Sequence, residues 1–197
     1  MLAVAGAGAD ILAHARKVLE LEAAALATLA RSLDGAFARA VALMQGLEGR
    51  VVCTGMGKSG HIARKIAATL SSTGTPAMYV HPGEASHGDL GMITAKDAVL
   101  ALSNSGETAE LKDLILYTRR FAIPLIAMIG KPDSTLGREA EVALVLPDFA
   151  EACPLGLAPT TSTTAMLALG DALAVALLQS TGFTPQHFAV FHPGGKL

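Results

Sequence analysis

The spacing of hydrophobic residues along this chain changes near residue 49. Before that point, apolar residues from Ile11 to Leu33 recur at every third or fourth position, which predicts an amphipathic helix over residues 10–33. Phe37, Val41 and Met44 repeat the same spacing and predict a second helix over residues 35–47. This helical pair either packs against a partner subunit or covers one face of a sheet.

After Gly49 the pattern becomes short apolar runs separated by longer amphipathic segments. The runs predict five strands, over residues 51–54, 77–80, 98–102, 124–129 and 142–146. The segments between and after them predict helices over residues 60–72, 108–121, 134–140 and 159–181. Such alternation indicates an α/β fold, in which a five-stranded parallel sheet carries helices on both faces.

No repeat, low-complexity region or linker divides the chain. We therefore expect one domain over residues 1–197, with the helical pair in residues 1–48 and an α/β core in residues 49–197. Ligands of parallel sheets bind beyond the carboxyl ends of the strands, near a switch in strand order. The loops that follow the strands are therefore the places to look for chemistry.

Composition narrows the classes of partner. Apolar residues make up 51% of the chain and charged residues 16%, which supports a large core and a buried subunit interface. A net charge of -2, 4% aromatic residues and no Trp argue against nucleic acid and anionic membranes. Residues 1–10 lack the basic start of a secretory signal, and the apolar stretch 165–178 is short and contains Asp171. The expected location is the cytoplasm.

The two cysteines are too few and too far apart for a disulfide scaffold or a zinc ribbon. Cys53 lies in an apolar run and is expected to be a small buried hydrophobe.

The segment Ser103–Thr108 is the strongest candidate for a binding site. It reads Ser-Asn-Ser-Gly-Glu-Thr and lies between a predicted strand and a predicted helix. Free N–H groups and the dipole at a helix N-terminus favour a phosphate. The turn contains no Lys or Arg, so it would hold the anion by hydrogen bonds from N–H groups and hydroxyls.

The segment Gly55–Gly60 follows the first strand and fits the pattern G-x-G-x-x-G. Dinucleotide binding also requires an acidic residue at the end of the second strand, where this chain has His81. A P-loop would need Gly where Val52 stands. What remains is a glycine turn that presents Lys58 and Ser59 at a strand end, or else a surface lysine in a tight turn.

Histidines and acids occupy the remaining loops. His81 and His87, with acids nearby, fit either a metal site or acid–base chemistry. We interpret His81, beside Pro82, as structural and favour a functional role for His87. Glu107 and Glu110 are three residues apart at a predicted helix start, where the helix dipole alone explains Glu107.

Glu151 stands in an apolar loop ahead of a hydroxyl-rich helix start. Burial there would raise the pKa of its carboxyl and suit it to carry protons, while the hydroxyls would cap the helix. The tail adds a last histidine, His192, before Pro-Gly-Gly.

With these loops assembled, the chain resembles the sugar isomerase (SIS) domain family, whose phosphosugar signature is similar to Ser103–Thr108. The similarity is more specific to the D-arabinose 5-phosphate isomerases, and it is carried by the segments Gly55–Ile62, His81–Gly91, Glu151–Thr160 and His192–Gly195. It extends from about residue 51 to the C-terminus.

The resemblance implies reversible isomerisation of D-ribulose 5-phosphate and D-arabinose 5-phosphate through an enediol, without metal or other cofactor. That reaction supplies the precursor of Kdo, a sugar of lipopolysaccharide. It also implies an α/β/α sandwich (the SIS fold) and a homotetramer with sites at subunit interfaces. The family's active-site positions fall on Lys58, His87, Glu110, Glu151 and His192. Its phosphate-binding positions fall on Ser59, Ser103, Ser105 and Thr108.

Two other functions fit the same loops: isomerisation of another phosphosugar, and non-catalytic sensing of a sugar phosphate. Longer members of the family continue into a pair of CBS domains, which the sequence does not contain. We therefore expect either a SIS-only member or a piece cut at a domain boundary.

Overall fold

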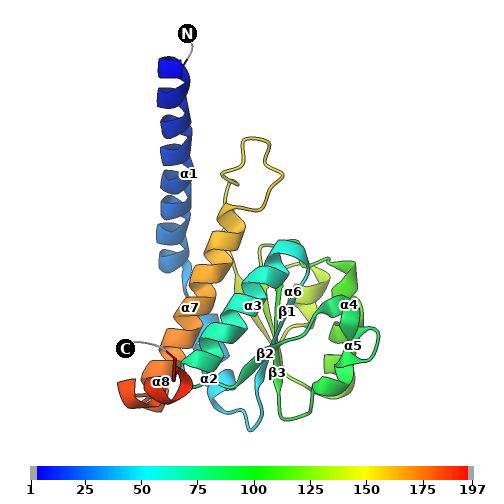
Figure 1. Cartoon of the computed structure of the whole chain (residues 1–197). Coiled ribbons are helices and arrows are strands. Elements are labelled where there is room, and N and C mark those ends of the chain that lie inside the picture. The colour runs from blue at the N-terminus through cyan, green and yellow to red at the C-terminus, as the bar shows by residue number, and fades with distance from the viewer. Residues whose placement is uncertain (1–3, 195–197) are drawn as a thin grey trace.

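The computed structural model describes residues 4–194 (Figure 1). Its strands are β1 (Val51–Gly55), β2 (Ala77–Tyr79), β3 (Ala98–Ser103), β4 (Leu125–Ile129) and β5 (Val142–Val145). Its α-helices are α1 (Val4–Ser32), α2 (Gly35–Gln45), α3 (Gly57–Ser72), α4 (Pro82–Ala85), α5 (Lys112–Arg120), α6 (Thr135–Glu139), α7 (Thr161–Thr181) and α8 (Pro185–Phe191). Two 3-10 turns complete the order, η1 (Asp89–Met92) and η2 (Ala109–Leu111).

The five strands form one parallel sheet in the order β2-β1-β3-β4-β5. The predicted α/β sandwich with a five-stranded parallel sheet is therefore confirmed. The chain leaves β1 toward β2 and then returns past it to β3, so the order switches between β1 and β3. A crevice forms outside the carboxyl ends of the strands at such a switch point. Gly55 pairs with Leu102 in the register, which brings the loops after β1 and β3 together there.

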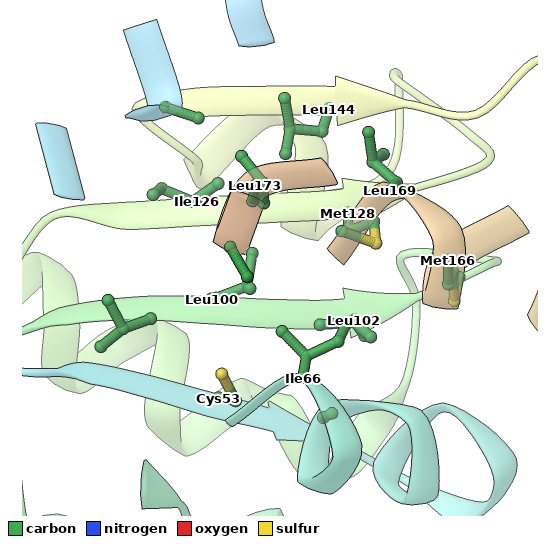
Figure 2. Packing of buried hydrophobic residues seen from close by; sticks show 14 of the residues in the cluster. Cys53, Ile66, Leu100, Leu102, Ile126, Met128, Leu144, Met166, Leu169 and Leu173 are labelled. Atoms are coloured by element: carbon green, nitrogen blue, oxygen red, sulfur yellow. The ribbon is translucent and has the colours of Figure 1, made fainter. Parts of the chain in front are cut away.

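Alternate residues of each strand supply two separate cores. On one face, Cys53, Leu100 and Leu102 pack with Ile66 of α3 and with Met166 of α7 (Figure 2). On the other face, Val52, Val99 and Ala101 pack beneath α5 and its neighbours. This is the period-two alternation of a strand, and because both faces are covered the strands read as continuous apolar runs.

The helices α3 and α7 lie side by side and run in the same direction. Ser59 Oγ near the start of α3 is 3.9 Å from Met166 Sδ near the start of α7. A Cβ on Gly74, just after α3, would lie 2.5 Å from Phe183 Cδ2, just after α7. Both helices therefore begin at the carboxyl edge of the sheet.

The helix α7 is long and apolar enough to cross a membrane by length and composition. Half of its most apolar part is buried inside this domain, and Asp171 on the helix pairs with Lys65 of α3. These contacts are those of a core helix.

The N-terminal helical pair divides its contacts. Helix α2 covers the sheet through Ala36, Ala40 and Met44, which belong to the same core as Cys53. The second half of α1 packs on α7, while its first half stands clear of the domain (Figure 1). Ile11 and Leu12 in the first half, and Leu19 just past the middle of the helix, remain exposed.

Several element boundaries differ from the sequence prediction. Helix α3 begins at Gly57 instead of residue 60, and α7 begins at Thr161 instead of residue 159. The segment 81–91, predicted as a polar loop, forms α4 and η1, and the tail forms α8. These pieces are four to seven residues long, which is too short for a hydrophobic period to reveal.

Candidate active site

Two glycines shape the loop between β1 and α3. Gly57 has a φ of +58°, which a glycine adopts without strain. A Cβ on Gly60 would lie 2.5 Å from the Gly55 carbonyl oxygen, so the helix can approach the strand end only without a side chain there. The Tyr79 hydroxyl donates to that same carbonyl at 2.9 Å. Lys58 is exposed and Ser59 is half-buried in the first turn of α3, directly after the carboxyl end of β1.

The turn after β3 is shaped by its own hydroxyl groups. The buried Ser103 Oγ accepts the Gly106 N–H at 3.0 Å and lies 2.7 Å from Thr108 Oγ1. Ser105 is exposed, and its hydroxyl accepts the Glu107 N–H at 3.2 Å. The prediction of a helix start at Thr108 is wrong in detail, since the 3-10 turn η2 follows and α5 begins only at Lys112.

The loop between β4 and α6 holds this turn from the side. Gly106 has a φ of +66°, and a Cβ there would lie 1.9 Å from Ser134 Oγ. The Gly106 carbonyl accepts the Leu136 N–H at 3.0 Å. Glu107 Oε1 accepts the Thr135 N–H at 2.7 Å. The turn is therefore a fixed cradle rather than a loose loop.

The role expected for Glu107 needs correction. The sequence suggested that the dipole of its own helix explains it, but Glu107 lies outside η2 and α5 and instead binds the first turn of α6. The hydrogen bond from Thr135 lowers the pKa of the Glu107 carboxyl. The acid thus ties the turn to a neighbouring element.

Glu151 binds the start of α7. Its Oε2 accepts the Thr160 N–H at 2.7 Å, the Thr160 hydroxyl at 3.0 Å and the Ser162 N–H at 3.4 Å. Burial raises the pKa of the Glu151 carboxyl, but the hydrogen-bonding groups of Ser162 and Thr160 together outweigh it, and the net pKa is lowered. The prediction of a raised pKa is therefore wrong, because the loop places the carboxylate on helix N–H groups.

The other predicted residues occupy different surroundings. His81 caps α4 by accepting the Gly83 N–H on Nδ1 at 3.2 Å, which is a structural role, as expected. His87 is exposed, directly before Gly88, which has a φ of +128°. Glu110 is exposed on η2, close in sequence to the Ser103–Thr108 turn.

His192 lies apart from all of these residues. It caps the end of α8, where its Nδ1 is 2.9 Å from the Phe188 carbonyl oxygen and its ring stacks on Phe188 at 3.8 Å. Helix α8 follows the far end of α7, a helix about 30 Å long at 1.5 Å per residue. Figure 1 shows α8 and the Glu151 loop at opposite ends of α7. One chain therefore brings together the loops after β1 and β3 but does not bring His192 to them. Gly195 of the same motif lies outside the described residues.

The two cysteines differ. Burial raises the pKa of Cys53 to about 12, and this residue is fully buried as expected. The backbone N–H groups of Ala158 and Leu155 lower the pKa of Cys153. Within residues 10–194, no three His, Cys, Asp or Glu side chains gather in a way that could hold a metal ion.

Sequence reasoning missed some residues that support the site. Thr160, Thr161 and Ser162 appeared only as part of a run of hydroxyl residues, without a link to Glu151. Ser134 and Tyr79 were predicted only as parts of a helix and a strand, because their contacts with the site loops join elements that are distant in the sequence.

The fold is a five-stranded parallel sheet with helices on both faces, and the loops after β1 and β3 meet at its carboxyl edge. The sequence profile of the SIS domain family matches residues 47–176, and the chain belongs to this family.

Individual members of the family give closer matches to the chain than the family profile alone. The chain is 56% identical over 190 residues to the arabinose 5-phosphate isomerase KdsD of Yersinia pestis, and 53% identical to that of Escherichia coli K12. Each match covers 96% of this chain and 58% of the relative. The chain therefore spans less than two thirds of the length of these curated relatives.

Solved structures agree with the fold. An E. coli CFT073 protein in complex with A5P superposes with a TM-score of 0.91 at 39% identity, covering 94% of this chain and 98% of that one. The Vibrio vulnificus NanR protein complexed with ManNAc-6P has a TM-score of 0.77 at 22% identity, covering 95% and 70% of the two chains. The second similarity concerns the fold alone.

Proposed function

We propose that the chain is an aldose–ketose isomerase that interconverts D-ribulose 5-phosphate and D-arabinose 5-phosphate through an enediol. The observation that carries this proposal is the 53–56% identity to arabinose 5-phosphate isomerases over 96% of the chain. The similarity to a structure in complex with A5P, the abbreviation of arabinose 5-phosphate, supports the same substrate. The cradle at Ser103–Thr108 is suited to the phosphate group.

The predicted site residues suit the steps of such a reaction. Ser59, Ser103, Ser105 and Thr108 anchor the phosphate together with N–H groups of the turn. Ser103 also holds the turn in shape, because its hydroxyl accepts the Gly106 N–H and lies 2.7 Å from Thr108 Oγ1. Isomerisation then needs a base at carbon, proton delivery to the oxygens and stabilisation of negative charge. Lys58 stabilises that charge, Glu151 or Glu110 moves the carbon-bound proton, and His87 or His192 moves protons on oxygen.

Within one chain His192 lies far from the other predicted site residues, so it can act in the reaction only at the site of a second subunit. We propose a homotetramer in which α8 of one chain reaches the crevice of another. Large apolar side chains are exposed on the elements that would meet such partners: Ile11 (66%) on α1, Leu155 (78%) and Leu157 (80%) in the Glu151 loop, and Val190 (73%) on α8. Water contact at so many apolar side chains is unfavourable, which favours a covered surface.

Subunit mixing tests the shared site. Lys58→Ala and His192→Ala chains are each expected to be inactive alone, and mixed tetramers are expected to regain activity because some sites then combine an intact Lys58 with an intact His192. Light scattering gives the mass of the assembly. If exchanged mixtures stay inactive while each variant assembles normally, the shared site is wrong.

In the cell we propose that the reaction takes place in the cytoplasm and supplies the precursor of Kdo for lipopolysaccharide. Two other functions remain to be separated from it: isomerisation of another phosphosugar, and non-catalytic binding of a sugar phosphate.

Deuterium exchange distinguishes these functions. D-Ribulose 5-phosphate is incubated with the protein in D₂O, and NMR follows deuterium at C2 of the aldose product. The isomerase gives deuterated arabinose 5-phosphate, whereas a sensor binds the sugar without exchange and an isomerase of another sugar turns over only its own substrate. Loss of a general base costs on the order of 10²–10⁴ in rate. Near-normal turnover of both Glu110→Gln and Glu151→Gln would contradict the role of the glutamates.

A further inference from the structure

The carboxylate of Glu151 is held by one of its two oxygens. All three of its hydrogen bonds, from the Thr160 N–H, the Thr160 hydroxyl and the Ser162 N–H, reach Oε2. Within residues 10–194, Oε1 accepts no hydrogen bond from a side chain or from the backbone. The carboxylate is therefore fixed in orientation while one oxygen stays available.

Thr160 connects this carboxylate to its own loop. The Thr160 hydroxyl donates to Glu151 Oε2, and its oxygen accepts the Ala152 N–H at 3.0 Å. The neighbouring Thr161 hydroxyl accepts the same Ala152 N–H, also at 3.0 Å, but it makes no hydrogen bond to the carboxylate. Two adjacent threonines thus bind the loop equally, and one of them also binds Glu151.

Ser162 has a hydroxyl with no partner among the described residues. Its Oγ is buried, since Ser162 is 5% exposed, and it forms no hydrogen bond of ordinary geometry. The Ser162 hydroxyl nevertheless acts on the Glu151 carboxylate and lowers its pKa. An unsatisfied buried hydroxyl is unfavourable and needs a reason. The reason we see is that the Ser162 hydroxyl serves as a second donor beside the Glu151 carboxylate, which must keep its negative charge.

We propose that Thr160 and Ser162 are positioning residues for Glu151: they hold Oε2 at the start of α7, so that Oε1 is free to exchange a proton with the substrate. This inference rests on the proposed isomerase function and on Glu151 being its proton carrier. The groups that act on the carboxylate belong to Thr160 and Ser162, and none of them carries a charge. The hold therefore depends on hydrogen bonds and on the dipole of α7.

The direction in which the pKa of Glu151 changes depends on whether the donors stabilise its ionised or its protonated form. Hydrogen bonds to a carboxylate favour its ionised form and lower its pKa. Without the Thr160 hydroxyl, the pKa of Glu151 rises and the ionised base is lost at a higher pH. The acid limb of the kcat profile then moves to higher pH. The KM for the phosphosugar is expected to change little, because the phosphate is bound elsewhere.

Four variants of the full chain test this. Thr160→Val removes the hydroxyl and is expected to lower kcat on the order of 10-fold, the equivalent of one hydrogen bond to a charged group. Thr160→Ser keeps the hydroxyl and should restore the wild-type profile. Ser162→Ala should shift the acid limb in the same direction as Thr160→Val. Thr161→Val is the matched control, since it loses the same bond to Ala152 but none to Glu151, and its acid limb should stay in place.

If Thr160→Val and Thr161→Val behave alike, the hydroxyls only stabilise the loop and the proposal fails. Thermal unfolding of each variant identifies general loss of structure. If Thr160→Val has lost its structure, the acid limbs of the other two variants decide: Thr160→Ser should keep the wild-type limb and Ser162→Ala should shift it, and equal limbs in these two variants would overturn the proposal.

A measurement without turnover separates this inference from the proposed function. ¹³C NMR of the glutamate carboxyl groups, with Glu151 assigned through Glu151→Gln, follows its titration directly. Thr160→Val should raise that titration midpoint and Thr161→Val should not. A wild-type protein that does not isomerise its substrate overturns the proposed function, while an unmoved Glu151 titration overturns the positioning role.

Discussion

The cradle at Ser103–Thr108 depends on a position that only glycine can occupy. Gly106 has a φ of +66°, and an added Cβ would meet Ser134 at 1.9 Å from Oγ and 2.4 Å from Cβ. Ser134 cannot simply rotate away, because its hydroxyl caps α6 by accepting the Gly137 N–H at 3.2 Å. We therefore predict that Gly106→Ala damages both stability and phosphate binding.

Two contributions set how much the free energy of unfolding falls in Gly106→Ala. The left-handed backbone costs a residue with a Cβ about 1–2 kcal/mol. Forcing a methyl group into a packed site costs about 1–3 kcal/mol more. The free energy of unfolding should thus fall by about 2–5 kcal/mol. The movement of the turn also pulls apart the hydroxyls and N–H groups that would meet the phosphate, so KM should rise.

Gly182→Ala is the matched control. Gly182 has a nearly identical φ of +65° at the end of α7, but an added Cβ meets nothing within 4 Å there. It carries the backbone cost alone, about 1–2 kcal/mol, and should leave KM unchanged. Urea unfolding at one fixed protein concentration gives the stabilities, and steady-state kinetics gives KM. Equal losses in the two variants, with equal KM, would refute the close approach of the turn to Ser134.

Three further predictions concern other parts of the structure. Gly170→Ala should destabilise the protein, because the new methyl would lie 2.3 Å from Ile66 Cδ1. In an Ile66→Ala background the same substitution should instead stabilise the protein by about 1 kcal/mol, because Ala has the higher helix propensity. Urea unfolding measures both changes, and the same sign in both backgrounds would disprove the contact between α3 and α7. The pKa of Glu107 is lowered in the folded state, so its carboxylate stabilises the fold above the ordinary pKa of 4.5, and this stabilisation is lost as the pH falls through the lowered pKa. The difference in unfolding free energy between wild type and Glu107→Gln should therefore shrink on acidification. A difference that does not depend on pH would contradict the bond to α6. Cys153 should react with iodoacetamide well before Cys53, whose thiol is buried with a pKa of about 12, and mass spectrometry that finds Cys53 modified first in the folded protein would contradict this.

The strands and long helices were predictable because each carries its own local pattern. The apolar run at 98–102 predicts β3, and the three- and four-residue spacing up to Leu33 predicts α1. The turn at Ser103–Thr108 was also recognisable, since its hydroxyl residues are adjacent in the sequence. The short pieces α4, η1 and α8 were missed because one or two turns show no periodicity.

The environment of Glu151 was beyond sequence reasoning. An acid in an apolar loop suggested burial and a raised pKa, but the loop folds back and places the carboxylate on the N–H groups of Thr160 and Ser162. Glu107 gave the same lesson, since its partner Thr135 is 28 residues away. A pKa depends on donors within a few ångströms, and sequence distance does not report them.

By itself, the sequence determined the α/β class, the five parallel strands, the hydroxyl-rich turn at Ser103–Thr108 and the resemblance to the SIS family, because each of these is carried by residues that are close together along the chain. Only the tertiary structure decided that the strand order switches between β1 and β3, that Ser134 supports the turn, and that His192 stands at the far end of α7 from Glu151. Those facts depend on how elements pack in space, and packing joins residues whose separation in sequence carries no information about their contact.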